Sequence, residues 1–243
     1  MIYFVQIRRY VYAHISLMRW GIHLLLQGAY GKLRQSQYEP VQQIYLKTLE
    51  TARMINRLLN VSRLERGKFN FVPQKFSLTA LIDEVIRDFQ SIKHEEYTNR
   101  IAHLNVSAQP LYINADQERV REILEIVIDN AYNYSPKNPE ITISVTETSF
   151  ACILDYYNQP SKMLKGVRIR VADKGVGISA SDRKKIFTKF FRGKNVTSFN
   201  TSGLGIGLAY AQSLINLHHG KIEIHSTPRK GTSVDIYLPI TID

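Results

Sequence analysis

Three glycines, at positions 203, 205 and 207, could bind the phosphates of a ligand. They lie in the stretch TSGLGIGLAYAQSLINLHHG (201–220), just before an apolar helix that is predicted to begin near Leu208. Backbone N–H groups at the start of a helix bind polyphosphates well. A Rossmann dinucleotide site would need a strand before the glycines, but the preceding RGKNVTSFNTS is polar and loop-like, and the Walker pattern is absent too. The glycine run therefore predicts a phosphate-binding loop of another kind.

An asparagine pair on another predicted helix could hold a metal ion. Asn130 and Asn133 share one face of a helix predicted over residues 116–135, together with Ile126. An asparagine carbonyl can ligate Mg²⁺, a hard ion that prefers oxygen. Taken alone, these residues are better explained as a polar helix end near Ser135 and Pro136.

A carboxylate follows a predicted strand in the stretch VADKGVGIS (171–179). Asp173 could accept a hydrogen bond from an exocyclic amine such as that of adenine, while Gly175 and Gly177 let the backbone approach a ligand. An ordinary strand-to-loop turn with an exposed aspartate is the alternative. The three segments together indicate a site for a nucleotide and its metal ion.

The elements that must position these residues form a mixed pattern from residue 78 onward. Strands are predicted at 111–115, 141–148, 167–173, 221–226 and 231–239, and helices at 78–95, 116–135 and 205–218. Strands with helices on one side predict an α+β sandwich. The segment 149–164 is predicted as an extended hairpin or insertion without an assigned function.

The first 65 residues have a different pattern, which predicts two long helices. On the first helix, apolar side chains recur at spacings of 4, 3, 4 and 3 residues, at Val11, Ile15, Met18, Ile22 and Leu25. The second helix has a similar stripe at Val41, Tyr45, Leu49, Ala52, Ile55 and Leu59. Pro40 suits the first position of this second helix. Such narrow stripes bury little surface in a lone hairpin, so we expect a homodimer that forms a four-helix bundle.

Composition narrows the class of protein. The chain has 243 residues and a net charge of +11, but its basic residues are scattered, so nucleic acid is not expected as a partner. Cys152 is the only cysteine, which excludes an internal disulfide and a thiolate metal cluster and favours a reducing, cytoplasmic setting. No apolar run approaches the roughly 18 residues of a transmembrane helix.

The motifs of the second half resemble the catalytic ATP-binding domain of sensor histidine kinases, which belongs to the wider family of gyrase, Hsp90 and MutL ATPases. They are NAYNYSP, DKGVGI, KIFTKFFRG, GLGIGL and HHGKIEIHSTPRKGTSVDIYLP, in this order. The helical hairpin, closed by RLLNVSRLERGKF, looks like the dimerisation and histidine-phosphotransfer domain of the same family. We therefore expect a hairpin domain at 1–66, a linker at 67–77 and an ATP-binding domain of the α/β sandwich type at 78–243.

The resemblance implies roles for the matching residues. Asn130 looks like the Mg²⁺ ligand, Asp173 like the acceptor of the adenine amine, and Arg192 like the basic residue that reaches phosphate. The other residues implied at the ATP site are Asn133, Tyr134, Gly175, Gly177, Phe191, Gly203, Leu204, Gly205, Gly207, Leu208 and Thr232, with Phe190 beside Phe191. The polar loop 193–202 is expected to be a mobile lid.

The phosphoacceptor motif of the family, roughly S-H-[EQ]-L-R-T-P-L, does not occur on the first helix. Counting back from RWGIHLLLQGAYGKL (19–33) places Arg9 at the histidine position, and arginine is permanently protonated and not nucleophilic. His14 lies five residues further on, which is roughly 140° around a helix and roughly 7 Å along it. His14 is the candidate substitute acceptor, with a structural or surface histidine as the alternative, and His23 lies further still.

The nucleotide site also departs from the family pattern. Ile126 stands where an asparagine is usual and Asn133 where a lysine is usual, so a polar group near the metal and a positive charge near phosphate are lost. One function that fits is an ATP-dependent histidine kinase core that passes the γ-phosphate to a hairpin histidine and on to a response regulator receiver domain. The alternative is a pseudokinase, a dimeric ATP-binding scaffold without autophosphorylation. A hydrolytic ATPase is disfavoured, because neither Glu122 nor Glu125 lies one turn before Asn130.

Overall fold

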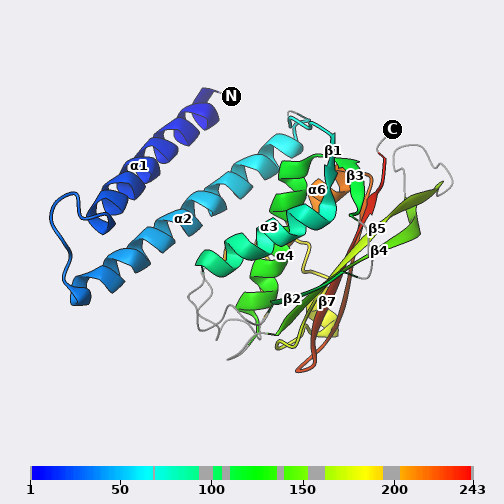
Figure 1. Cartoon of the computed structure of the whole chain (residues 1–243). Helices are drawn as coiled ribbons and strands as arrows, with labels where there is room; N and C mark the ends of the chain where they lie inside the picture. Colours follow the sequence, from blue (N-terminus) through cyan, green and yellow to red (C-terminus); the bar gives the residue numbers. More distant parts are fainter. Residues whose placement is uncertain are drawn as a thin grey trace. The chain divides into compact units, whose positions relative to one another are not determined.

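The computed structural model describes residues 2–67, 69–92, 101–105, 110–135, 140–152, 162–193 and 203–241. The chain divides into two compact units, Met1–Phe69 and Asn70–Asp243. The first unit is a helical hairpin, and in the second unit helices cover a β-sheet (Figure 1). This is the α+β architecture that the sequence predicts.

The hairpin consists of α1 (Ile2–Leu26) and α2 (Gln35–Leu64). Two glycines in the turn between them, Gly28 and Gly31, have positive φ angles of 74° and 105°, a conformation that glycine adopts at little cost. The apolar stripe on α1 is only partly covered, since Ile15 is buried while Met18 is 51% exposed. The six apolar residues of the α2 stripe are all half-buried. The hairpin therefore leaves much of its apolar surface open.

The start of α2 differs from the sequence prediction. The helix begins at Gln35, so Pro40 lies inside it rather than at its first position. Arg34 is the N-cap, and its N–H donates to the side-chain oxygen of Gln37 at 3.0 Å. This bond satisfies a backbone donor at the helix start, as in a capping box, and it explains why the helix extends upstream of the proline.

The second unit is built on a five-stranded sheet with the strand order β2-β4-β5-β7-β6. Its strands are β2 (Ile101–Asn105), β4 (Ile141–Cys152), β5 (Lys162–Asp173), β6 (Lys221–Thr227) and β7 (Gly231–Pro239). β2 runs parallel to β4, and the other neighbouring strands are antiparallel. Outside this sheet, β1 (Gln74–Ser77) and β3 (Tyr112–Ala115) form an antiparallel pair.

One face of the sheet packs against helices and forms the core (Figure 1). These helices are α3 (Leu78–Ile92), α4 (Gln117–Asn133) and α6 (Gly207–Leu217), and a short α5 (Ala180–Arg183) follows β5. On β5, Val167, Ile169 and Val171 are at most 1% exposed. The alternating Arg168 and Arg170 are partly exposed, because successive side chains of a strand point to opposite faces.

The unassigned segment 149–164 begins and ends as regular strand. β4 and β5 pair over their full 12 residues, from Ile141↔Asp173 to Cys152↔Lys162. β7 pairs with β5 only from Gly166 to Asp173. The two strands therefore continue past β7 as a two-stranded arm, and residues 153–161 of the predicted insertion lie outside the described residues.

Candidate functional site

Asp173 ends β5, and the backbone holds its carboxylate. Oδ1 accepts hydrogen bonds from the N–H of Gly175 at 2.7 Å and of Thr232 at 3.2 Å. Burial raises the pKa of the Asp173 carboxyl above its usual value, and the two N–H donors act in the opposite direction. Within the part of the chain that the structure describes, no hydrogen bond engages Oδ2. This second oxygen can therefore accept a hydrogen bond from a ligand.

The loop after Asp173 contains two glycines at close backbone contacts. A Cβ on Gly175 would lie 2.5 Å from the carbonyl oxygen of Tyr134, and a Cβ on Gly177 would lie 2.0 Å from that of Thr227. Gly177 also has a φ of 67°. In addition, the N–H of Val176 donates to the Tyr134 carbonyl at 3.1 Å. The loop therefore packs against both the end of α4 and the end of β6.

Ser226 connects these segments, although the sequence analysis did not single it out. Its hydroxyl oxygen accepts a hydrogen bond from the N–H of Ile178 at 2.8 Å and donates to the carbonyl of Gly231 at 3.0 Å. It also lies 2.9 Å from Oγ1 of Thr232. Ser226 therefore orients the side chain of Thr232, whose backbone N–H donates to the Asp173 carboxylate. No spacing rule marks this serine, because its role depends on the pairing of β6 with β7.

The end of α4 brings the predicted asparagines to the same corner. Asn130 and Asn133 are partly exposed in its last turn, and Tyr134 is the C-cap. The N–H of Tyr134 donates to the Asn130 carbonyl at 3.1 Å. Because the Tyr134 carbonyl contacts the loop after Asp173, both asparagines lie close to that loop. Their side-chain amides offer oxygen ligands for a hard cation.

The glycine run lies against the aromatic pair. A Cβ on Gly205, which has a φ of 70°, would lie 2.5 Å from the Phe191 carbonyl oxygen. The N–H of Phe190 donates to the Gly205 carbonyl at 2.9 Å, and Phe190 itself has a positive φ of 64°. Nη1 of Arg192 donates to the Gly203 carbonyl at 3.0 Å. Arg192 is therefore held beside the glycines.

The start of α6 is open toward the glycine run. Within the described residues, no side chain caps its N-cap residue Ile206, and its first turn contains no acidic residue. The N–H groups of Gly207 and Leu208 belong to this first turn, where the helix has a partial positive charge. A Cβ on Gly207 would lie 3.3 Å from Cγ2 of Ile126, which is 1% exposed. Ile126 therefore packs against Gly207 as a core residue. Leu204, which precedes Gly207 in the chain, is 45% exposed.

The predicted nucleotide residues thus come together from α4, β5, β7 and the start of α6. The expected lid lies mostly outside this description, because residues 194–202 are not among the described residues. The contacts that join the elements are made largely by the backbone. They are the Tyr134 carbonyl to the loop after Asp173, the Thr232 N–H to Asp173, and the Gly205 carbonyl to the aromatic pair.

The candidate acceptor His14 belongs to the hairpin unit, where its side chain is exposed on α1. Nδ1 of His14 lies 2.7 Å from the carbonyl oxygen of Tyr10, and the two ring centroids are 4.1 Å apart. A carbonyl oxygen only accepts, so this contact favours the neutral tautomer with the proton on Nδ1 and the lone pair on Nε2. His23 is also exposed and stacks 5.9 Å from the ring of Tyr45. Arg9 lies in the same helix, but its side chain is not among those described.

A second polar cluster lies on the face of the sheet opposite the helices. Glu223, His225 and Asp235 offer ligand atoms within 4.8 Å of one another. Arg170 donates to both oxygens of Asp235 at 2.7 Å, and Lys221 lies 2.6 Å from Glu223. Because a cation already neutralises each carboxylate, we interpret this cluster as cross-strand ion pairs rather than a metal site.

Comparison with known proteins identifies the second unit. Residues 115–242, more than half of the chain, match the family described as histidine kinase-, DNA gyrase B-, and HSP90-like ATPase. The chain is 28% identical over 226 residues to the sensor histidine kinase WalK of Bacillus subtilis. It is 30% identical over 220 residues to the signal transduction histidine-protein kinase AtoS of Escherichia coli. These alignments cover 93% and 88% of this chain but only 34% and 32% of the relatives, so the chain spans about a third of their length.

Solved structures share the fold over both units. Full-length ShkA in complex with AMPPNP has a TM-score of 0.65 and 20% identity, with 98% of this chain and 46% of that chain covered. The histidine kinase AdeS of Acinetobacter baumannii has a TM-score of 0.58 and 17% identity, with 93% and 94% covered. In the part of the chain that the structure describes, no helix combines the length and the apolar character needed to cross a membrane.

Proposed function

Because the chain belongs to the histidine kinase-, DNA gyrase B-, and HSP90-like ATPase family and has the fold of a sensor histidine kinase core, we propose that it binds Mg-ATP with the adenine on Asp173. The observation that carries this proposal is the state of the Asp173 carboxylate. Two backbone N–H groups hold Oδ1, which leaves Oδ2 to accept the exocyclic amine of adenine. Thr232, oriented by Ser226, supplies a hydroxyl next to the same position.

The triphosphate would extend from this pocket toward the start of α6. The uncapped N–H groups of its first turn favour negative charge, and Arg192 lies beside the glycine run. Asn130 is the residue we assign to Mg²⁺, with Asn133 in the same turn of α4. When bound, the metal ion neutralises phosphate charge. The side chains of Tyr134 and Phe191 would border the nucleotide.

We assign the acceptor role to His14, so that the proposed activity is that of a histidine kinase with a relocated acceptor. The exposed imidazole has Nδ1 engaged with the Tyr10 carbonyl, so the lone pair on Nε2 faces outward as a nucleophile. In this function Nε2 attacks the γ-phosphorus, the bond to the bridging oxygen breaks, and ADP leaves. The phosphoryl group would then pass to an aspartate of a response regulator receiver domain.

A pseudokinase is the second candidate function, and one observation favours it. Arg9 stands where the family has its histidine, and a guanidinium cannot act as a nucleophile. In this case nucleotide binding would regulate a dimeric scaffold without phosphoryl transfer. Both functions need the same homodimer, which the half-buried stripe of α2 supports.

Intact-mass measurement after incubation with Mg-ATP distinguishes the two functions. We expect one phosphoryl adduct that is lost in acid, because phosphohistidine is acid-labile, and we expect His14→Asn to abolish it. His23→Asn is the matched control, since His23 is the other exposed histidine of the hairpin, and it should leave the adduct in place. An adduct that persists in His14→Asn would contradict the assignment. No adduct in a wild-type protein that ATP still protects against thermal unfolding would establish the pseudokinase.

A further inference from the structure

The first residues of the ATP-binding unit are held by hydrogen bonds to residues far along the same unit. This unit begins at Asn70, and the N–H of Val72 donates to Oδ2 of Asp116 at 2.9 Å although 44 residues separate them. Asp116 is only 5% exposed. Its other oxygen, Oδ1, accepts from the N–H of Arg119 at 3.2 Å and so caps the start of α4. One buried carboxylate therefore fixes both the start of α4 and the backbone at Val72.

The same segment also contacts a buried histidine at the end of α6. His218 is 0% exposed, and its Nδ1 donates to the Leu214 carbonyl at 2.7 Å. Nε2 is then unprotonated and accepts the N–H of Asp116 at 3.2 Å. The Phe71 ring and the imidazole pack in a T-shaped arrangement, with centroids 4.8 Å apart and planes at 83°. Burial lowers the pKa of His218, which keeps the ring neutral for both bonds at neutral pH.

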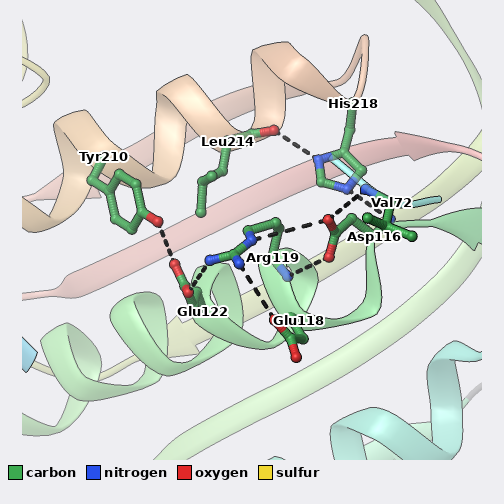
Figure 2. A network of polar contacts seen from close by, with 8 residues as sticks. All are labelled: Val72, Asp116, Glu118, Arg119, Glu122, Tyr210, Leu214 and His218. Atoms are coloured by element: carbon green, nitrogen blue, oxygen red, sulfur yellow. Dashed lines mark hydrogen bonds and ion pairs between the residues drawn. The ribbon is translucent and has the colours of Figure 1, made fainter. Parts of the chain in front are cut away.

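Polar contacts join α4 to α6 beside this corner (Figure 2). Arg119 donates to one oxygen of Glu122, and the hydroxyl of Tyr210 donates to the other. Tyr210 is 0% exposed and the Glu122 side chain is 31% exposed, so this bond lies at the edge of the core. Figure 2 shows Tyr210 and His218 on α6 facing the side chains of α4. The corner made by the start of α4 and the end of α6 is therefore a rigid anchor.

The nucleotide residues lie at the opposite ends of the same two helices. α4 runs from this corner to Asn133, and α6 runs from Gly207 back to it. The 17 residues of α4 correspond to about 25 Å of helix. The segment that enters the unit is thus attached to the far end of the two helices that present the nucleotide site.

We propose that residues 70–73 form a strap, that is, a segment that Asp116 and His218 hold against the ATP-binding unit. The hinge between the two units then lies before Asn70. Gly67 suits such a hinge, because it has a φ of 62° and a Cβ placed on it would meet nothing within 4 Å. The inference rests on the proposed function in one respect, namely that bound ATP must be presented to the hairpin. Asp116 and His218 are then positioning residues that do not contact the nucleotide.

Amide hydrogen exchange at Val72, measured by NMR on the full chain, tests the strap. The Val72 amide should be protected in the wild type and exchange about tenfold faster in Asp116→Ser, because serine keeps one oxygen to cap α4 and loses the second. Val72→Ala is the matched control: the Val72 side chain is 56% exposed, so this variant should keep the protection. His218→Gln, which removes the ring under Phe71, is a second variant and should also accelerate exchange.

Two results would overturn the strap. One is a Val72 amide that exchanges freely in the wild type, because the hinge would then lie within residues 70–73. The other is an Asp116→Ser protein that folds and protects Val72 as well as the wild type does. ATP affinity should change less than about threefold in every variant, since Asp116 lies at the far end of α4. A wild type that protects Val72 but binds no ATP would contradict the proposed function and leave the strap intact.

Discussion

The helical hairpin and the ATP-binding unit differ in how they bury their apolar side chains. Among the described hairpin residues, Ile15 and Val61 are the buried apolar side chains, while Leu17 and Trp20 are 65% and 60% exposed. In the ATP-binding unit, side chains such as Ile169 are 0% exposed in a continuous core between sheet and helices. The comparison teaches that one unit closes its own core, while the other leaves an open apolar stripe for the second copy that we propose.

The two units also differ in how far their chemistry follows the family. In the ATP-binding unit, backbone contacts bring the predicted residues together around Asp173. In the hairpin, Arg9 occupies the expected acceptor position and His14 lies elsewhere on the helix. In the proposed function, nucleotide binding and phosphoryl acceptance would reside in separate units, so we expect a change in one to leave the other able to work.

The largest effect should come from charging the open stripe of the hairpin. Met18 and Leu25 are 51% and 36% exposed in a single chain, so Met18→Glu with Leu25→Glu should cost the monomer little. In a four-helix bundle both carboxylates would be buried, and we expect dimer affinity to fall by more than about 100-fold. Sedimentation velocity would measure this, with the exposed Gln43→Glu as the control. A dimer that persists in the double variant would contradict a bundle formed through this stripe.

The next effect concerns the loop after β5 in the ATP-binding unit. Gly177→Ala should destabilise it by about 3 kcal/mol, because φ is positive and the new Cβ would lie 2.0 Å from the Thr227 carbonyl oxygen. Gly203→Ala is the matched change in the same unit, since a Cβ there meets nothing within 4 Å, and it should be nearly neutral. Thermal unfolding followed by circular dichroism would compare them. Equal stabilities would mean that the loop can move away from β6.

A smaller effect should depend on pH. Burial lowers the pKa of His218 below its ordinary value of 6.5, although Asp116 acts in the opposite direction. The unfolded chain therefore binds a proton below about pH 6.5 while the folded chain resists it, so stability is complete above that pH and falls as the pH drops. We expect a loss of about 1 kcal/mol between pH 7.5 and 5.5 in urea unfolding. His218→Gln should flatten this slope, and an unchanged slope would refute the role of His218.

The smallest effect should be a gain of stability in the hairpin. Gly21 lies inside α1, and a Cβ there would meet nothing within 4 Å. Gly21→Ala should therefore stabilise the hairpin by about 0.5–1 kcal/mol through helix propensity. Trp20 is the only tryptophan, so its fluorescence reports the unfolding of this unit. A loss of stability would instead place Gly21 in a close contact between helices of the dimer.

Much of the fold could be predicted from local patterns. The alternation of Val167, Ile169 and Val171 predicts a strand with one buried face, and the structure confirms it. The seam at Ile15 likewise predicts the helical hairpin. The start of α2 could not be predicted from Pro40, because a side-chain bond from Gln37 extends the helix upstream. β2 was also missed, since its place in the sheet depends on parallel pairing with a distant strand.

The candidate site could be predicted only where its residues carry a chemical signature. Asp173 and the glycines at 205 and 207 have such signatures in their type and spacing. Ser226 and Asp116 do not, because each accepts a hydrogen bond from a residue distant in sequence, Ile178 and Val72, that only the folded chain brings near. The sequence also leaves open whether His14 accepts phosphate, and our assignment rests on the exposure and the hydrogen bond of its ring in the structure.

Isothermal titration of Mg-ATP into the wild type and Asp173→Asn tests the central claim most directly. The asparagine oxygen can still accept the N–H of Gly175, but its NH₂ group replaces the acceptor that we assign to adenine. We predict that ATP affinity falls by about 100-fold, while Asp83→Asn, which removes the same charge on the exposed side of α3, changes little. Equal affinities for the wild type and Asp173→Asn would contradict the proposed nucleotide site.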